Sequence, residues 1–136
     1  MPHLVLLYTP DLEAEADLSA LCRALADTML EQKDETGQKV FPTGGTRVLA
    51  YPAAHCAVAD GQGQYGFLYA NLRIGAGRSP TVHQSVGQAL LGTLRSHLDA
   101  LLQKRPIGLT LQIDESVGQV FDAKHSSLHS LFNKAT

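Results

Sequence analysis

The sequence predicts an α/β fold in which two β-α-β units form a four-stranded mixed sheet with two helices on one face. Four short runs are rich in apolar, strand-forming residues, and two longer segments carry apolar residues at helical spacing. These segments follow one another as strand, helix, strand, twice, so each helix connects two strands that are expected to be parallel. The chain 1–136 is expected to form a single domain with one core.

The first half is expected to supply one strand-helix-strand unit. The run HLVLLYT is a short apolar strand that ends at the polar stretch PDLEAEAD. A helix is then predicted over DLSALCRALADTMLEQK, with Asp17 as its N-cap. After a polar loop, TRVLAYPAAHCAVA has strand character, although Pro52 indicates an edge, a bulge or a break.

The second half repeats this plan, without obvious residue identity, and we interpret it as a pseudo-repeat. The turn DGQGQ leads into YGFLYANLRIG, which is expected to pair antiparallel with the preceding strand. The longest helix is predicted from the N-cap Ser79 to Lys104, where Pro106 stops it. The run IGLTLQIDE is the fourth strand, and the tail AKHSSLHSLFNKAT is expected to form a short helix or to wrap onto a neighbour.

Charge and cysteine usage exclude several classes of function. The formal net charge of −2, with scattered Lys and Arg, gives no basic footprint for nucleic acid and no polybasic segment for a membrane. Cys22 and Cys56 form no C-x-x-C pair, so reduced thiols and a cytoplasmic location are expected. The apolar run at 4–7 is too short for a signal peptide or a membrane span.

Two arginines beside glycine turns are candidate anion-binding residues. Arg78 lies in IGAGRSP, before a helix whose first N–H groups are unpaired, and this position suits a carboxylate or a phosphate. Arg47 lies in FPTGGTRVLAY, beside a Gly-Gly turn at the start of a strand. Taken alone, each pattern is more typical of a solvated surface arginine.

Other reactive side chains form no recognisable site. His125 and His129 are four residues apart, but no H-E-x-x-H pattern or carboxylate partner accompanies them. Cys22 falls on the apolar helical stripe, and Cys56 has no identifiable base. No metal site is therefore expected.

Pro2 has two interpretations. Proline lacks a backbone N–H and is tolerated at the first position of a strand, so one interpretation of Pro2 is a strand-edge residue. If Met1 is removed, Pro2 instead becomes a free secondary amine, which is a candidate general base. The dipeptide alone favours the strand-edge interpretation.

The segments MPHLV, FPTGGTRV, ADGQGQYGF and LRIGAGRS, in this order and at these separations, resemble the 5-carboxymethyl-2-hydroxymuconate isomerase family of the tautomerase superfamily. The resemblance runs from Pro2 to about Phe132. It implies a pseudo-repeat fold assembled as a homotrimer, with active sites near subunit boundaries. It also implies that Pro2 is the catalytic base and that Arg47 and Arg78 bind substrate. Thr46 departs from the aliphatic residue often found in the family, which bears on substrate choice.

The resemblance implies a cofactor-independent isomerase that moves a proton within an unsaturated keto or enol di- or tricarboxylic acid of aromatic catabolism. Such a base works best with a pKa near neutral, and an apolar pocket and nearby arginines both lower the pKa of an amine. Two alternatives remain open: a tautomerase for another enol acid, such as a phenylpyruvate-like compound, and a catalytically silent trimeric binding protein on the same fold.

Overall fold

Four strands form one mixed sheet in the computed structural model, which describes residues 2–132. The strands are β1 (His3–Tyr8), β2 (Arg47–Pro52), β3 (Gly66–Gly75) and β4 (Ile107–Ser116), and their order across the sheet is β2-β1-β3-β4. β1 is parallel to β2, β3 is parallel to β4, and the central pair β1 and β3 is antiparallel. The predicted pair of β-α-β units in a mixed sheet is confirmed.

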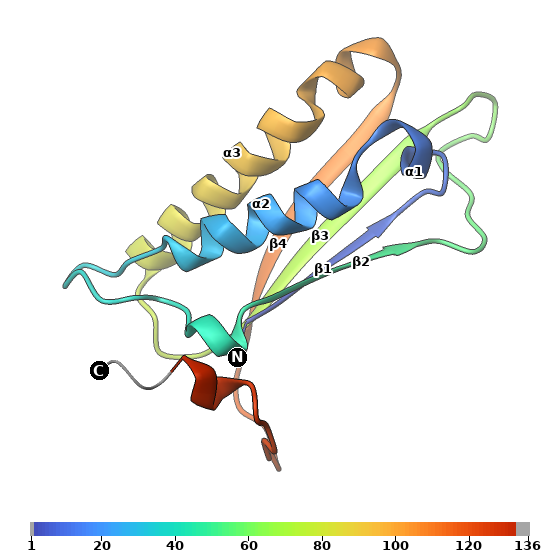
Figure 1. Ribbon diagram of the computed structural model, residues 1–136. Helices are drawn as coiled ribbons and strands as arrows, with labels where there is room; N and C mark the ends of the chain where they lie inside the picture. The colour runs from blue at the N-terminus through green and yellow to red at the C-terminus, as the bar shows by residue number, and fades with distance from the viewer. Residues whose placement is uncertain (1, 133–136) are drawn as a thin grey trace.

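Two long helices cover one face of this sheet (Figure 1). They are α2 (Leu18–Leu30), which connects β1 to β2, and α3 (Pro80–Lys104), which connects β3 to β4. The predicted N-caps are confirmed, because Asp17 accepts a hydrogen bond from the N–H of Ala20 and Ser79 accepts one from the N–H of Val82. The short helix α1 (Leu12–Glu15) was not predicted; it occupies the stretch after β1 that we expected to be irregular.

The core lies between the helices and the sheet, and alternation along the strands builds it. Leu4, Leu6 and Tyr8 of β1 point to the helices, as do every second residue of β3 and the apolar side of β4. The helices contribute Leu21, Leu25 and Met29, followed by Val82, Val86, Leu90, Leu94 and Leu98 from α3. This stripe is the one predicted from helical spacing.

The predicted antiparallel pairing of the second and third strands is wrong. β1 lies between β2 and β3, and β2 ends at Pro52 rather than continuing to residue 59. The crossover helix α2 carries the chain to the far side of β1, so β2 becomes an edge strand. Residues 53–65 then pass the end of β1, where the N–H of Ala53 donates to the carbonyl of Tyr8 at 2.8 Å.

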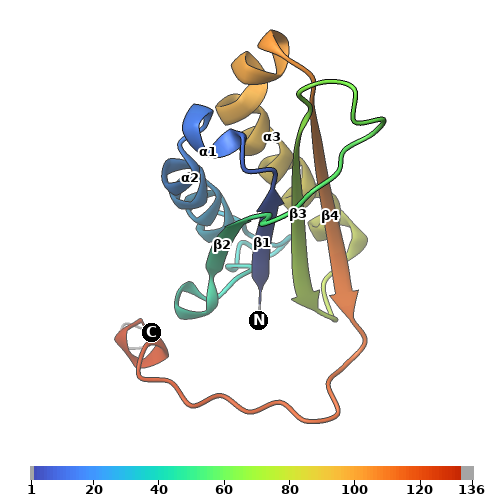
Figure 2. The same cartoon turned by 90° about the vertical axis from the view of Figure 1, so that its right-hand side faces the viewer.

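The C-terminal segment returns across the molecule (Figure 2). After β4 it runs beneath the ends of the strands and forms the 3-10 turn η2 (His129–Leu131), which packs against a second 3-10 turn, η1 (Thr43–Gly45), just before β2. The short helix expected in the tail is confirmed as this single turn. Residues 133–136 of the predicted tail lie outside the described part of the chain.

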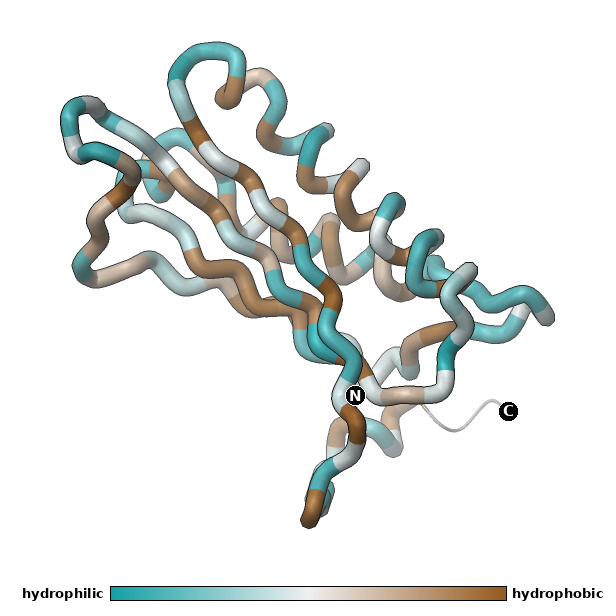
Figure 3. Tube along the Cα trace, turned by 180° about the vertical axis from the view of Figure 1, so that it is seen from behind, coloured by the Kyte–Doolittle hydropathy of each residue, from teal (hydrophilic) through white to brown (hydrophobic). Residues whose placement is uncertain are grey.

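Within residues 2–132, no helix covers the second face of the sheet. Its apolar side chains Leu7, Leu49, Tyr51 and Phe67 are between 36% and 49% exposed. Figure 3, which views the molecule from behind, shows brown hydrophobic segments along these strands. A face of this kind is typical of a surface that another protein chain covers. Within residues 2–132, no helix is both long enough and apolar enough to cross a membrane.

Candidate active site

Pro2 lies at the end of β1 beside the glycine pair of η1. Its side chain is buried, in phase with Leu4 and Leu6 on the helix side of the sheet. A side-chain carbon placed on Gly45 would lie 3.9 Å from Pro2 Cδ, so η1 forms one wall around the proline ring. The predicted removal of Met1 concerns a residue outside those that the structure describes.

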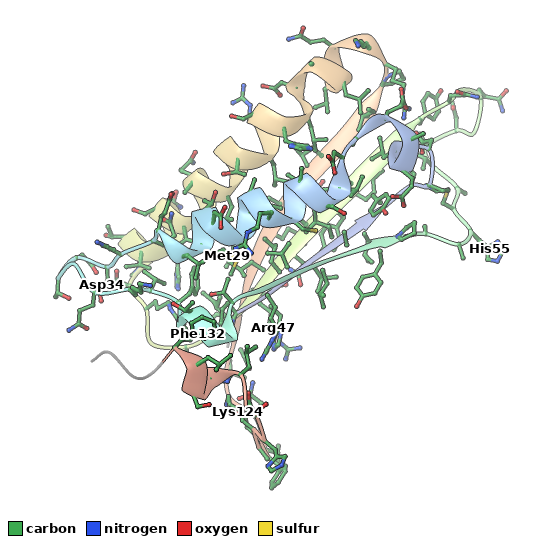
Figure 4. The ribbon with its side chains drawn as sticks, in the orientation of Figure 1. Met29, Asp34, Arg47, His55, Lys124 and Phe132 are labelled. Atoms are coloured by element: carbon green, nitrogen blue, oxygen red, sulfur yellow. The ribbon has the colours of Figure 1, made fainter. Side chains whose placement is uncertain are left out.

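Two arginines flank a histidine on the open face of the sheet, one residue along the chain from Pro2. In the strand register, His3 of β1 is paired with Arg47 of β2 on one side and with Arg73 of β3 on the other. Figure 4 shows Arg47 at this end of the molecule, with His55 at the opposite end. Partial desolvation, followed by repulsion from Arg47 and then Arg73, lowers the pKa of His3 below 6.5. The electrostatic field one residue from Pro2 therefore disfavours positive charge.

Arg78 lies on the other side of the sheet and connects two loops. Its Nη2 donates to the carbonyl of Val40 at 2.9 Å and its Nη1 to the carbonyl of Gly75 at 3.1 Å. Its guanidinium also stacks over the ring of Phe41, 5.4 Å from the ring centre. Two of its five N–H donors are thus used by the backbone, and the segment leading into η1 is fixed to the loop after β3.

The structure divides the predicted site residues between two regions. Pro2 and Arg47 lie at the ends of neighbouring parallel strands, next to η1. Arg78 instead lines a groove of about 440 Å³ with Glu35, Lys39 and Ser79. A larger groove of about 590 Å³, between α3 and β4, is lined by aliphatic side chains and by polar ones that include His83 and Glu115. It contains none of the three predicted residues, so its size does not make it the site.

Two residues near Pro2 were not assigned to the site from the sequence. Arg73 is paired with His3 in the strand register, as Arg47 is on the other side. His129 was considered only as a metal ligand, yet its Nε2 lies 3.6 Å from a carbon placed on Gly45. Alternation along β3, which places Arg73 on the opposite face from Leu72 and Ile74, offers a weak signal for Arg73. The contact between η1 and the tail has no sequence signal. Among residues 2–132, no three His, Cys, Asp or Glu side chains gather as metal ligands.

Comparison with known proteins identifies the fold and the family. Residues 2–132 match the family described as 5-carboxymethyl-2-hydroxymuconate isomerase. The chain belongs to this family. A 5-carboxymethyl-2-hydroxymuconate Delta-isomerase of Escherichia coli is 31% identical over 132 residues, covering 97% of this chain and 99% of that protein. Family membership makes the chain an isomerase and confirms the resemblance seen in the sequence.

Solved structures agree with this assignment. A crystal structure of a 5-carboxymethyl-2-hydroxymuconate delta-isomerase is 50% identical, with a TM-score of 0.94, covering 100% of this chain and 95% of that one. A 5-carboxymethyl-2-hydroxymuconate isomerase from Deinococcus radiodurans R1 is 32% identical, with a TM-score of 0.85, covering 98% and 95%. A fused 4-OT described as a symmetric trimer shares the fold of the isomerase at 14% identity and a TM-score of 0.55, covering 90% and 93%.

Proposed function

We propose that this isomerase moves a proton between two carbons of an unsaturated keto or enol di- or tricarboxylic acid, with the nitrogen of Pro2 as the base and then the acid. The substrate class is that of 5-carboxymethyl-2-hydroxymuconate, the compound in the names of its relatives. The observation that carries the proposal is the position of Pro2, which is buried beside η1 and is the chain neighbour of His3, the residue that Arg47 and Arg73 flank in the strand register.

The proton chemistry follows from this environment. A free α-amine titrates at about 7.7–8.0, and a base that must also return its proton works best near the operating pH. Burial of Pro2 and the two guanidinium groups both disfavour the ammonium form. The lowered pKa of His3, one residue along, has these same kinds of cause. Removal of Met1 would leave the Pro2 amine free to take a proton from the substrate carbon and return it to another.

The arginines supply the binding energy for a carboxylate-rich substrate. Arg47 lies beside Pro2, where its planar guanidinium is suited to a bidentate pair with a carboxylate or to the oxygen that gains charge during proton removal. Arg78 retains three N–H donors beyond those used by Val40 and Gly75. More than one arginine favours a substrate with more than one carboxylate, and so favours a dicarboxylate over a phenylpyruvate-like acid.

We further propose that the isomerase works as a homotrimer in the cytoplasm. The open sheet face exposes Leu7, Leu49, Tyr51 and Phe67, and the segment after β4 exposes Val117 and Val120 almost completely. Burial of these side chains against second and third copies of the chain would remove them from water. The family resemblance implies active sites near subunit boundaries, and Arg78 lines a groove that does not include Pro2 of the same copy.

Kinetics on defined variants test this proposal. Intact mass first establishes that the purified protein begins at Pro2, and the wild type is then assayed for conversion of 5-carboxymethyl-2-hydroxymuconate. Loss of a general base costs about 10²–10⁴ in rate, and Pro2→Ala, which keeps a primary amine, is expected near the lower limit. Arg47→Gln is expected to raise KM, and Arg95→Gln, on the outer surface of α3, serves as the matched control.

Three results would contradict the proposal. The first is a mature protein that retains Met1, which blocks the amine and favours a silent binding protein. The second is a wild type that converts neither this substrate nor another enol acid. The third is a Pro2→Ala variant with the same kcat/KM as the wild type.

A further inference from the structure

The C-terminal turn η2 is built against the glycine pair beside Pro2. A side-chain carbon on Gly44 would lie 3.0 Å from the Cα of His129, which is closer than ordinary van der Waals contact. The Gly44–Gly45 pair therefore admits a close approach of two backbones, one from each end of the chain. Leu128 and Phe132, on either side of the turn, line a groove of about 540 Å³ with residues of α2 and η1.

The side chain of His129 is oriented toward the proline. Its Nδ1 lies 3.1 Å from Ser126 Oγ, and its Nε2 lies 3.6 Å from the point where a side-chain carbon of Gly45 would be. Pro2 Cδ, which is bonded to the proline nitrogen, lies 3.9 Å from that same point. The imidazole and the proline ring therefore border one small volume beside Gly45.

The hydrogen bonds of Ser126 assign the proton on His129. Ser126 Oγ accepts from the backbone N–H of Leu128 at 3.0 Å and from that of His129 at 3.4 Å. A hydroxyl has two acceptor positions and one hydrogen, so its hydrogen is the group left to donate to Nδ1. An imidazole that accepts at Nδ1 carries its proton at Nε2. Within residues 2–132, the structure gives this Nε2–H no hydrogen-bond acceptor.

We propose that His129 is a substrate-binding residue of the isomerase, and that its Nε2–H donates a hydrogen bond to an anionic oxygen of the substrate bound beside Pro2. The oxygen is a carboxylate or enolate oxygen, because the arginine-flanked site selects a carbon acid of that type. Ser126 is the positioning residue that fixes the tautomer. This inference rests on the proposed role of Pro2 and adds the C-terminal turn to the same site.

Steady-state kinetics with 5-carboxymethyl-2-hydroxymuconate test the role of His129. His129→Leu keeps the size of the side chain and removes the donor, so kcat/KM is expected to fall about 10- to 100-fold, the range for a hydrogen bond to a charged group. His129→Gln, whose amide N–H extends about as far as Nε2, is expected to restore most of this loss. Ser126→Ala is expected to give a smaller, several-fold loss. His55→Leu, at the opposite end of the molecule, is the matched control (Figure 4).

Whether the His129→Leu substitution changes KM or kcat identifies the oxygen that His129 binds. A rise in KM alone indicates a carboxylate bound equally in the ground state, whereas a fall in kcat indicates an enolate bound in the transition state. His129→Leu with wild-type kcat/KM would overturn the inference while leaving Pro2 as the base. Equal losses for the Leu and Gln variants, matched by equal losses of thermal stability, would also overturn it. A wild type that isomerises no enol acid would instead refute the proposed function itself.

Discussion

Arg78 donates a hydrogen bond of 2.9 Å from Nη2 to the carbonyl oxygen of Val40, a residue 38 positions earlier in the chain. A side chain that the family resemblance presents as a substrate ligand therefore also holds the backbone together. The planar guanidinium suits both tasks, because it makes several hydrogen bonds in one plane and stacks on Phe41 with its face. Changes at this position are expected to alter stability and binding together.

Arg78→Ala is expected to lower the free energy of unfolding by about 1–3 kcal/mol, since two backbone carbonyls lose a charged donor. It is also expected to raise KM. Arg78→Lys keeps the charge but not the planar fork, so it should recover little of either property. Urea unfolding and steady-state kinetics measure the two effects. An Arg78→Ala protein with unchanged stability would show that these contacts contribute nothing to the fold.

Arg105 is expected to be a stabilising residue at the opposite end of the sheet. Its guanidinium is 17% exposed and forms ion pairs with Asp11 and Glu15, joining the end of α3 to α1. Arg105→Met is expected to cost about 1–3 kcal/mol of unfolding free energy. The exposed pair Arg23–Asp27 gives the control, because Arg23→Met should cost less than about 0.5 kcal/mol. Equal costs for the two variants would contradict this difference.

The ion pair between Asp11 and Arg105 is expected to make the stability of the fold depend on pH in acid. Burial alone would raise the pKa of Asp11, but hydrogen bonds from Thr9 and Arg105 and the charge of Arg105 bring it below its usual 3.8. A carboxyl whose pKa is lower in the folded state than in the unfolded state stabilises the protein at pH values above the unfolded-state pKa. This stabilisation is lost as the pH falls through the folded-state pKa. Denaturation measured between pH 2 and pH 6 should show a smaller acid dependence for Arg105→Met than for the wild type.

Ionisation of Tyr8 is expected to lower the stability of the fold at high pH. Burial, with a hydrogen bond of 2.5 Å to Glu13, raises the pKa of Tyr8 from 10.0 to about 12. The folded state favours the neutral phenol, so this contribution is complete below pH 10 and is lost as pH rises from 10 to about 12. Tyr8→Phe should remove this part of the pH dependence. An ultraviolet titration in which Tyr8 ionises at pH 10 in the folded protein would contradict the prediction.

Leu7 and Leu49 test the proposed assembly. They are 47% and 46% exposed on the sheet face that the helices leave open. The double variant Leu7→Lys, Leu49→Glu is expected to sediment as a monomer, because charged side chains would have to be buried on assembly. Ala100→Glu, on the exposed surface of α3, is the control and should sediment like the wild type. A wild type that is itself monomeric at micromolar concentration would refute the trimer.

Gly44 tests the contact between η1 and the C-terminal turn. Gly44→Ala places a carbon 3.0 Å from the backbone of His129, so the turn is expected to shift and kcat/KM to fall several-fold. Gly92→Ala is the matched control, because nothing lies within 4 Å of its new side chain. It should leave kcat/KM unchanged and stabilise α3 by about 0.5–1 kcal/mol through helix propensity. Unchanged activity in Gly44→Ala would indicate that the turn adjusts without consequence.

The sequence predicted most of the elements, because each is specified locally. Helical spacing of apolar residues located α2 and α3, and Asp17 and Ser79 marked their first turns. Strand pairing was harder to predict, because it depends on where a helix returns the chain. A glycine-rich turn between two apolar runs indicated a hairpin, whereas the crossover helix had already carried β2 to the other side of β1. The thirteen residues between Pro52 and Gly66 are long for a hairpin, and this length was the missed signal.

The candidate site was predicted in part. Pro2, Arg47 and Arg78 came from local motifs, and their roles remain predictions. The proximity of Arg73 to His3 follows only from the register of β3 against β1. The approach of His129 to Gly45 joins residues 84 positions apart through two irregular turns, and neither amino-acid spacing nor hydrophobic pattern encodes such a contact.

The strand order β2-β1-β3-β4 relates the two units by an approximate two-fold axis between β1 and β3. Because these two strands run in opposite directions, each unit begins at its own end of the sheet. The proposed amine belongs to the first unit alone, because β3 begins in mid-chain with the amide of Gly66, which donates to the carbonyl of Pro106 at 3.0 Å. At the end of the sheet where β3 begins, Arg105 forms ion pairs with Asp11 and Glu15. The proposed catalytic amine and this ion-pair cluster therefore lie at opposite ends of the sheet.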